Sequence, residues 1–254
     1  MNYHIAFRTL VFKEIRRFLR IWPQTLLPPA ITTTLYFLIF GKLIGERIGP
    51  IGDVSYMRYI VPGVILMSVI SHSYANVVSS FYSTKFQRHI EELLVSPVPN
   101  WVILSGYVVG GIARGVLVGL VVAMIAWFLG DLPLVAPLLA MLVMVMTATL
   151  FSLAGFINAV FADSFDDIAI IPSFILTPLS YLGGVFYSVS MLPDIWQKIS
   201  LFNPILYMIN AFRYSAIGVS DVEVSWALSI ICGMTLLLAG FALWLLHKGV
   251  GIKN

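Results

Sequence analysis

The chain has 254 residues, of which 59% are hydrophobic and 11% are charged, and its formal net charge is +3. Soluble domains carry about 25% charged residues, so this composition excludes an ordinary soluble protein and indicates an integral membrane protein. Apolar runs fill most of the length and leave no room for a soluble catalytic domain, and the single cysteine excludes an intrachain disulfide. We therefore expect one all-α transmembrane domain over residues 1–254.

Residues 4–22 are predicted to form an amphipathic helix in the membrane interface. One helical face is apolar and the opposite face is basic, with Lys13, Arg16, Arg17 and Arg20 facing anionic headgroups. The alternative is a solvated tail before the first span. No short apolar core with a small-residue cleavage site is present, so we expect no removable signal peptide.

Six runs are predicted to cross the membrane, at about residues 24–44, 59–80, 101–129, 134–161, 168–187 and 224–246. The fifth contains Pro172 and Pro178 and is followed by Gly183 and Gly184, so we expect kinks or breaks in it. Residues 188–214 are too polar to cross and are rich in aromatic side chains, which predicts short re-entrant or interfacial helices.

The third span has small residues at helical spacing, namely Gly106, Gly110, Gly111, Gly115 and Gly119. They repeat at i+4 in two overlapping registers and predict close helix contacts. Arg114 lies among them as a candidate intramembrane charge. An intramembrane cation is a functional candidate, yet Arg114 is also near enough to the span's start to snorkel to the interface, and the sequence leaves both readings open.

The loop after the fourth span contains three carboxylates, Asp163, Asp166 and Asp167. A cation site or an acid–base pair acting on lipid is conceivable here. The spacing of Ser164 and Asp167, however, is that of a capping box at a helix N-terminus, and we favour capping.

Polar side chains on three spans form a candidate pathway lining. The set is Tyr36, Ser68, His72, Asn76, Thr177, Ser180 and Tyr181. Such residues in hydrocarbon face either a wet cavity or one another across helix contacts, and the sequence does not separate the two. For His72 a hydrogen-bonded packing role is the favoured interpretation.

Residues 81–97 form a charged segment between the second and third spans. Phe86, Ile90, Leu93 and Leu94 would share one face of a single helix, while Lys85, Arg88, Glu91 and Glu92 take the other side. Pro97 and Pro99 would stop this helix. Its apolar face needs a surface to rest on, and its charged face is free to meet a partner.

The lysines and arginines suggest an orientation. With both termini cytoplasmic, nine lie inside: five in the N-terminal arm, two in residues 81–100, and Lys248 and Lys253. Five lie outside, namely Lys42, Arg47, Arg58, Lys198 and Arg213. This asymmetry favours cytoplasmic termini and a cytoplasmic 81–97 segment.

Catalytic motifs are missing from the sequence. It has no GxxxxGK[ST] phosphate loop, no metal cluster at ligand spacing and no convincing Ser-His-Asp order. His72 and Arg114 are the only ionisable groups that we place inside the spans, and no carboxylate joins them. A proton- or sodium-driven transporter normally has such a group near the midplane, so the energy is expected to come from a partner.

At this point the sequence resembles a family. The stretch KFQRHIEELLVSPVP between spans two and three, and LTPLSYLGGVFYSVSMLPDIWQKISLFNPILYMINAFRY before the last span, are similar to those of ABC-2 type permeases of ABC exporters. The similarity is nearest to bacterial inner-membrane permeases whose substrate is unassigned. It implies a homodimer that docks on two ATPase subunits, with ATP and magnesium bound by those subunits and no cofactor in this chain.

The resemblance also assigns roles to residues. The coupling helix that contacts the ATPase would include Lys85, Phe86, Arg88, Ile90, Glu91, Glu92 and Leu93. Residues 188–214 would cap the exit, and the first and fifth spans would form the dimer interface. Relatives move lipids, lipid-linked glycans, polysaccharide or drugs, and no nucleic-acid partner is implied. The alternative is a structural or regulatory membrane subunit that does not transport.

Overall fold

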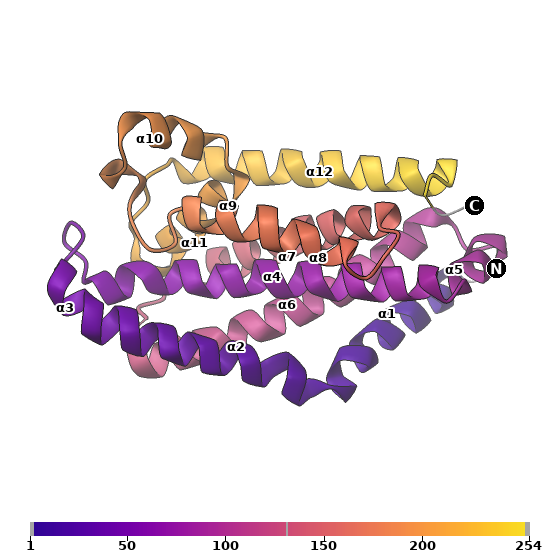
Figure 1. Ribbon diagram of the computed structural model, residues 1–254, viewed down its shortest axis with the longest axis horizontal. Coiled ribbons are helices and arrows are strands. Elements are labelled where there is room, and N and C mark those ends of the chain that lie inside the picture. The colour runs from indigo at the N-terminus through magenta and orange to yellow at the C-terminus, as the bar shows by residue number, and fades with distance from the viewer. Residues whose placement is uncertain (1–2, 131, 252–254) are drawn as a thin grey trace.

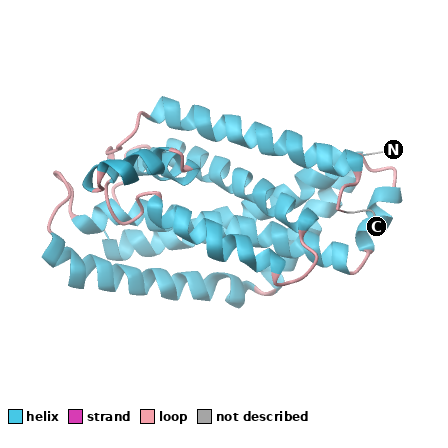
Figure 2. Ribbon diagram, turned by 45° about the horizontal axis from the view of Figure 1, so that its top comes forward, coloured by secondary structure: helices cyan, strands magenta, loops and turns pink. Residues whose placement is uncertain are grey.

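The computed structural model describes residues 3–130 and 132–251, so Lys253 lies outside the described residues. Within those ranges the chain is helical, and its one strand-like pairing is an isolated bridge between Ile51 and Val54. Figure 1 shows the long helices side by side, and Figure 2 shows that only short loops connect them. The expected all-α class is confirmed for the described part of the chain.

The first half of the chain contains α1 (Tyr3–Arg20), α2 (Trp22–Tyr36), the π-helical η1 (Phe37–Ile44), α3 (Gly45–Ile48), α4 (Tyr56–Phe86), α5 (His89–Val95) and α6 (Asn100–Gly130). The second half contains α7 (Pro137–Phe161), α8 (Asp167–Ile171), the π-helical η2 (Pro172–Leu176), α9 (Thr177–Leu182), η3 (Val189–Met191), α10 (Asp194–Leu201), α11 (Pro204–Ile217) and α12 (Val224–Lys248).

Four of the described helices are long and apolar enough to cross a membrane: α4, α6, α7 and α12. The predicted first span, residues 24–44, corresponds to α2 together with η1, and α3 comes directly after it. The predicted fifth span is shorter than expected, because its helix ends at Leu182 and not at Tyr187. Gly184 there takes a φ of +76°, which an L side chain rarely adopts. The kink or break expected at Pro172 is not a break, because α8 passes directly into the π-helical turn η2 and the helix continues to Leu182.

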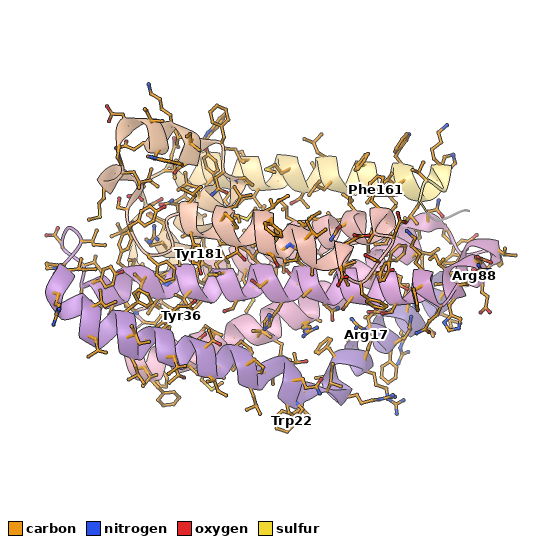
Figure 3. The ribbon with its side chains drawn as sticks, viewed as in Figure 1. Arg17, Trp22, Tyr36, Arg88, Phe161 and Tyr181 are labelled. Atoms are coloured by element: carbon orange, nitrogen blue, oxygen red, sulfur yellow. The ribbon has the colours of Figure 1, made fainter. Side chains whose placement is uncertain are left out.

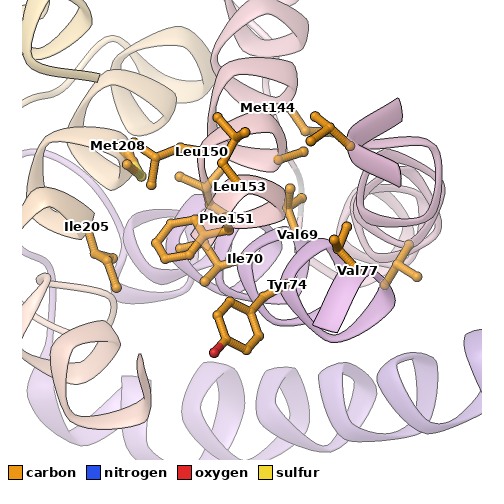
Figure 4. Close-up of a cluster of buried hydrophobic side chains, with 14 of the residues drawn as sticks. Val69, Ile70, Tyr74, Val77, Met144, Leu150, Phe151, Leu153, Ile205 and Met208 are labelled. Carbon is orange, nitrogen blue, oxygen red and sulfur yellow. The ribbon is translucent and has the colours of Figure 1, made fainter. Parts of the chain in front are cut away.

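The hydrophobic core is centred on α4, which packs between α6 and α7. Figure 4 shows Val69, Ile70 and Tyr74 of α4 meeting Phe151 and Leu153 of α7. Ile205 and Met208 of α11 close the same cluster from the other side, and all these side chains are buried. Since α11 is buried along most of its length, it belongs to the bundle and is not a surface helix.

The glycines of α6 allow three other helices to approach closely, which confirms the close helix contacts that their spacing predicts. A Cβ atom added at Gly106 or Gly110 would collide with Leu10 or Glu14 of α1. A Cβ added at Gly115 would lie 2.8 Å from Ser73 Cβ of α4. The glycines of one register, Gly106 and Gly110, therefore contact α1, and those of the other, Gly111, Gly115 and Gly119, contact α4 and α7.

The bundle has two distinct ends. Figure 1 places α5, the start of α1 and the end of α12 at one end, which we call the α5 end. It places α3 and α10 at the opposite end, which we call the α10 end. The two ends of the described chain therefore lie on the same side, as an even number of crossings requires.

A buried arginine organises the α10 end. Arg213 on α11 is fully buried, donates to the carbonyl oxygens of Tyr59 and Gly184, and lies 3.9 Å from a carboxylate oxygen of Asp221. Asp221 also accepts hydrogen bonds from Ser188 Oγ at 2.8 Å and Tyr59 Oη at 3.3 Å. The charge count above places Arg213 among the cations of the outside loops. In the structure Arg213 is instead the buried centre of a network that connects α4, α11 and two loops.

The loop before α8 forms the predicted capping box. Ser164 Oγ accepts from the backbone N–H of Asp167 at 3.1 Å, and Asp167 Oδ2 accepts from the N–H groups of Asp163 and Ser164 at 3.0 and 2.9 Å. These N–H groups, that of Asp163 first, lower the pKa of the Asp167 carboxyl below its usual range. The carboxylate of Asp167 thus serves to start a helix.

Candidate functional site

The corner between α4 and α5 is the most unusual backbone feature of the α5 end. Arg88 has a φ of +60°, which makes it the one non-glycine residue with a positive φ in the described part of the chain. The left-handed conformation of Arg88 breaks the helix, so α4 ends at Phe86 and α5 begins at His89. The prediction of one continuous helix over residues 81–97 is therefore wrong, although a short separate helix is present.

The corner also separates the predicted apolar stripe. Phe86 belongs to the last turn of α4 and is 64% exposed, whereas Ile90 of α5 is 1% exposed. Ile90 anchors α5 on the bundle, with Leu93 partly buried beside it. Arg88, Glu91 and Glu92 are exposed, so their charged groups face away from the bundle. Figure 3 shows Arg88 at the α5 end.

Two pockets flank α5. The first, of about 490 Å³, lies between α1, α5 and the start of α6, and Leu10, Leu93 and Ile103 are among the side chains that line it. The second, of about 330 Å³, has a more polar lining that includes Lys85, Glu91 and Asp163. Because a pocket lies on each side of α5, this helix contacts the bundle mainly through the buried Ile90. The helix therefore protrudes from the bundle.

Lys85 is bound within the chain. Its ammonium donates to the carbonyl oxygens of Val160 and Ala162, both at 2.8 Å, and lies 3.9 Å from Asp163 Oδ1. Carbonyl groups at the end of a helix lack partners within that helix, so Lys85 caps the C-terminus of α7. Tyr82 adds a bond from its hydroxyl to the Asp163 carbonyl oxygen at 2.8 Å. A role of Lys85 in coupling stays a prediction.

A row of polar side chains runs along α4 toward the middle of the bundle, at positions 80, 76 and 72. Ser80 donates to Glu14 of α1 at 2.9 Å. Asn76 accepts two bonds from Arg17 of α1, at 2.8 Å on its carbonyl oxygen and 2.9 Å on its side-chain oxygen. Figure 3 shows Arg17 where α1 lies against α4. We call this row, with its partners, the polar ladder.

Glu14 is the residue of the polar ladder that the sequence did not reveal. It is fully buried on α1, with its carboxylate 3.4 Å from Arg17 Nε and 3.6 Å from Lys13 Nζ. We had expected a basic face turned toward lipid headgroups and no carboxylate inside the bundle. Instead, the buried residues of α1 are Leu10, Glu14 and Phe18, so α1 packs into the bundle along a partly polar face.

Three residues of the predicted pathway set come together. Tyr36 of α2 and Ser68 and His72 of α4 line one pocket of about 220 Å³, which we call the α2–α4 groove. Its remaining wall includes Pro28, Pro29, Thr32, Thr33, Val64, Met67 and Ser71. On the α2 side of the groove, the hydroxyl groups of threonine and tyrosine side chains lie next to the apolar rings of two prolines.

The other four residues of that set lie elsewhere. Asn76 is buried and bonded to Arg17, and Ser180 is buried and donates to Leu176 O at 2.7 Å. Thr177 donates to Pro172 O at 2.9 Å. Tyr181 joins an aromatic cluster through Phe186, whose ring centroid is 5.9 Å from its own. Partners within the chain thus account for Ser180, Thr177 and the two oxygens of Asn76, whereas the buried side-chain nitrogen of Asn76 has no hydrogen-bond partner among the described residues.

The aromatic cluster connects the first and fifth predicted spans. Phe186 lies 5.9 Å from Tyr36 and 5.2 Å from Phe40, measured between ring centroids. Tyr36 is therefore shared by the cluster and the α2–α4 groove. Figure 3 shows Tyr36 and Tyr181 on the half of the molecule nearer the α10 end.

The described residues contain no group of three or more histidine, cysteine, aspartate or glutamate side chains that could hold a metal ion. Asp167 is committed to the capping box, and Asp163 and Asp166 are exposed beside it. The lipid-enzyme reading therefore receives no support from the arrangement of these carboxylates.

Taken together, the long apolar helices, the buried polar ladder and the protruding charged α5 define a multi-span membrane protein of the transport-permease class. The chain matches the ABC-2 type transporter family over residues 5–217 and belongs to that family. It is the membrane permease of such a transporter and carries no ATPase activity of its own.

Relatives extend the match over nearly the whole chain. It is 51% identical to the inner membrane transport permease YadH of Escherichia coli (strain K12) over 252 residues, which cover 99% of this chain and 98% of that protein. Nodulation protein J of Rhizobium leguminosarum bv. viciae is 24% identical over 199 residues, 78% of this chain and 77% of its own length. Nodulation protein J of Sinorhizobium fredii (strain NBRC 101917 / NGR234) is 25% identical over 201 residues.

Proposed function

We propose that this chain is one half of an ATP-driven exporter in a bacterial inner membrane. Two copies pair to form the pathway, and each docks on an ABC ATPase subunit that binds ATP and magnesium. Both termini and α5 face the cytoplasm. The nearly full-length similarity to an inner membrane transport permease supports the location, and the missing phosphate loop supports an external motor.

The observation that carries the proposal is the position of α5. It joins α4 to α6, two of the longest helices, and presents Glu91 and Glu92 to the outside while Ile90 holds it to the bundle. A partner that moves α5 therefore pulls on both helices at once. Exposed charges add partner specificity at modest energetic gain, which suits a docking element.

The first and fifth predicted spans form the proposed dimer interface. They contact each other through the Tyr36–Phe186–Tyr181 cluster, and both expose large apolar side chains, including Ile31 and Leu35 of α2 and Phe174 and Ile175 of η2. A face of this kind is buried either by lipid or by a second copy. Cysteine cross-links that join α12 to α12 and not α2 to η2 would count against it.

The proposed cargo is amphiphilic. The α2–α4 groove has the hydroxyl groups of Thr32, Tyr36 and Ser68 next to the apolar walls of Val64 and Met67. A lipid, a glycolipid or a drug-like molecule has both kinds of surface, so the lining of this groove suits one part of a molecule of this class.

The coupling function is tested by the triple variant Arg88→Gln, Glu91→Gln, Glu92→Gln. The variant and the wild-type chain are each purified with the partner ATPase subunit, and co-purification and ATPase stimulation are measured. We expect both to fall while the melting temperature of the permease is unchanged, because the three side chains are exposed. Glu223→Gln, an exposed change at the α10 end, is the control and should leave both intact.

Undiminished co-purification and ATPase stimulation by the triple variant would reject α5 as the coupling element. If the chain is instead a structural subunit, ATP hydrolysis by the assembled complex would drive no movement of amphiphiles across vesicles.

A further inference from the structure

The third rung of the polar ladder forms no hydrogen bond within the described part of the chain. On the first rung Ser80 is bonded to Glu14, and on the second Asn76 is bonded to Arg17. On the third rung His72 lies one turn further along α4, at the position that faces the α2–α4 groove. Among the described residues His72 makes no hydrogen bond, so its ring nitrogens are free for another group.

The group opposite His72 is Arg114. Helices α4 and α6 run antiparallel, and Gly110 of α6 lies against Asn76, with 3.6 Å from its added Cβ to the Asn76 side-chain nitrogen. Moving four residues forward on α6 and four back on α4 pairs Arg114 with His72. The contact of Gly115 with Ser73 confirms this register.

Arg114 is also without a partner. Its Nε is buried and makes no hydrogen bond, and none of its guanidinium nitrogens has a hydrogen-bond partner in the described part of the chain. Arg114 is close enough to Arg17 for their two positive charges to repel each other, and it is also close enough to His72 to disfavour a positive charge on the His72 ring. The buried Nε–H group of Arg114 is costly without a partner, because it is removed from water without compensation.

The local charge balance is positive. Glu14 is the carboxylate that packs against this region, and it already accepts from Ser80 and pairs with Lys13 and Arg17. The charge of Arg114 therefore remains uncompensated opposite His72, which lines the α2–α4 groove. A bound anion would complete the third rung as Glu14 and Asn76 complete the first two.

We propose that Arg114 and His72 form an anion-binding site that holds the acidic group, a phosphate or a carboxylate, of an amphiphilic cargo whose apolar part lies in the α2–α4 groove. Arginine suits this task because its planar N–H donors match both phosphate and carboxylate oxygens. The inference rests on the proposed export function and narrows the cargo to anionic amphiphiles.

The test uses two probes that differ only in a phosphate group, dioctanoylphosphatidic acid and dioctanoylglycerol. Binding to the full-length permease, purified without its ATPase in nonionic micelles, is measured by native mass spectrometry. We expect the wild-type chain to bind the phosphatidic acid about tenfold more tightly, the effect of one or two charge-assisted hydrogen bonds. Dioctanoylglycerol hemisuccinate, which carries a carboxylate and no phosphate, distinguishes a general anion site from a phosphate site.

Variants locate the site. Arg114→Gln should reduce the preference to below about twofold, and Arg114→Lys should keep most of it because the charge remains. Arg16→Gln removes an exposed cation from α1 and is the matched control. A preference that survives Arg114→Gln but is lost in Arg16→Gln would place the anion on the surface of α1 and overturn the proposal, as would a wild-type chain without any preference.

A second variant guards against misfolding. If Arg114→Gln lowers the melting temperature or the monodispersity, Ser68→Glu serves instead, because it places a carboxylate in the groove one turn from His72. It should abolish the preference for the phosphatidic acid, and an unchanged preference would reject the site. Since no ATPase is present, failure here leaves the α5 coupling experiment unaffected, and failure of coupling leaves this binding result standing.

Discussion

One guanidinium nitrogen of Arg17 on α1 donates to both oxygens of Asn76 on α4, at 2.8 Å to the backbone carbonyl and 2.9 Å to the side chain. The two residues are far apart in sequence, and their bond joins the N-terminal helix to the central helix of the core. With Glu14 buried one turn earlier, α1 is fixed by specific polar contacts and not only by the affinity of its cations for lipid.

Glu14→Gln should lower the stability of the permease by at least about 1 kcal/mol, because Arg17 loses the charge that pairs with it in a buried position. The Arg17 side chain is 32% exposed, which limits the loss. Thermal unfolding followed by size-exclusion chromatography measures it. Arg16→Gln should change stability by less than about 0.5 kcal/mol. An equal loss in both variants would mean that α1 is held by charge alone.

Gly110→Ala should destabilise the chain, although alanine is the better helix former by about 1 kcal/mol. The new Cβ would lie 2.5 Å from Glu14 Cβ, so α1 would have to move away from α6. Gly233→Ala in α12 is the control, since a Cβ there meets nothing within 4 Å. We expect the melting temperature to fall for Gly110→Ala and to stay or rise for Gly233→Ala; the reverse order would contradict the α1–α6 packing.

Arg88→Gly should stabilise the corner between α4 and α5 by about 1 kcal/mol, because glycine takes the left-handed conformation without steric cost. Arg88→Ala removes the same side chain and gives no such gain. Comparing the two by thermal unfolding and by co-purification with the ATPase subunit separates the backbone role of Arg88 from the role of its charge. Similar stability of the two variants would argue against strain at this corner.

Arg213→Leu should cost about 3–5 kcal/mol, because it leaves two carbonyl oxygens without their buried donor and the Asp221 carboxylate without its nearby cation. Lys198→Leu, in the exposed helix α10, removes a cation without touching that network. Expression level, unfolding temperature and proteolysis at the α10 end report the difference. Equal behaviour of the two variants would show that the Arg213 network does not hold this end together.

The capping box before α8 should make stability depend on pH. The lowered pKa of Asp167 means that its contribution is fully present above the ordinary aspartate pKa of about 3.9 and is lost as the pH falls through the lower folded value. Asp167→Ala should therefore be less stable than the wild-type chain at pH 6, and the gap should narrow at pH 3. The loss caused by Ser164→Ala should change less with pH, because a hydroxyl does not titrate there. A gap for Asp167→Ala that is constant across this range would contradict the assignment.

The sequence was sufficient for the helical class, for an irregular turn at Pro172 and for the capping box at Ser164. Each depends on local chemistry: the length of apolar runs, a missing N–H group and a three-residue spacing. The close contacts of the α6 glycines were also predictable, because small residues at i+4 spacing serve the same purpose in any helix pair. Which partner each glycine receives was not, since that depends on the arrangement of the whole bundle.

The burial of Glu14 had a signal in the sequence that we did not use. A helical projection of α1 places Glu14 on the apolar face, between Leu10 and Phe18, although it gives no sign that Ser80 and Asn76 will approach from α4. The corner at Arg88 was missed because nothing distinguishes an arginine in the left-handed conformation from one inside a helix. The groove was only partly foreseen: Tyr36, Ser68 and His72 come together there, whereas Asn76 and Ser180 are occupied by partners within the chain.

The polar ladder sets an order of events during synthesis. The α1 helix leaves the ribosome before α4 and α6, which hold the residues that receive Glu14 and Arg17. Until those helices are made, neither charged group has its buried partners, so α1 has to wait at the membrane–water boundary, where its cations are stable. A helix that is made before its partners is therefore docked after them, and its docking reports that the central helices have already assembled.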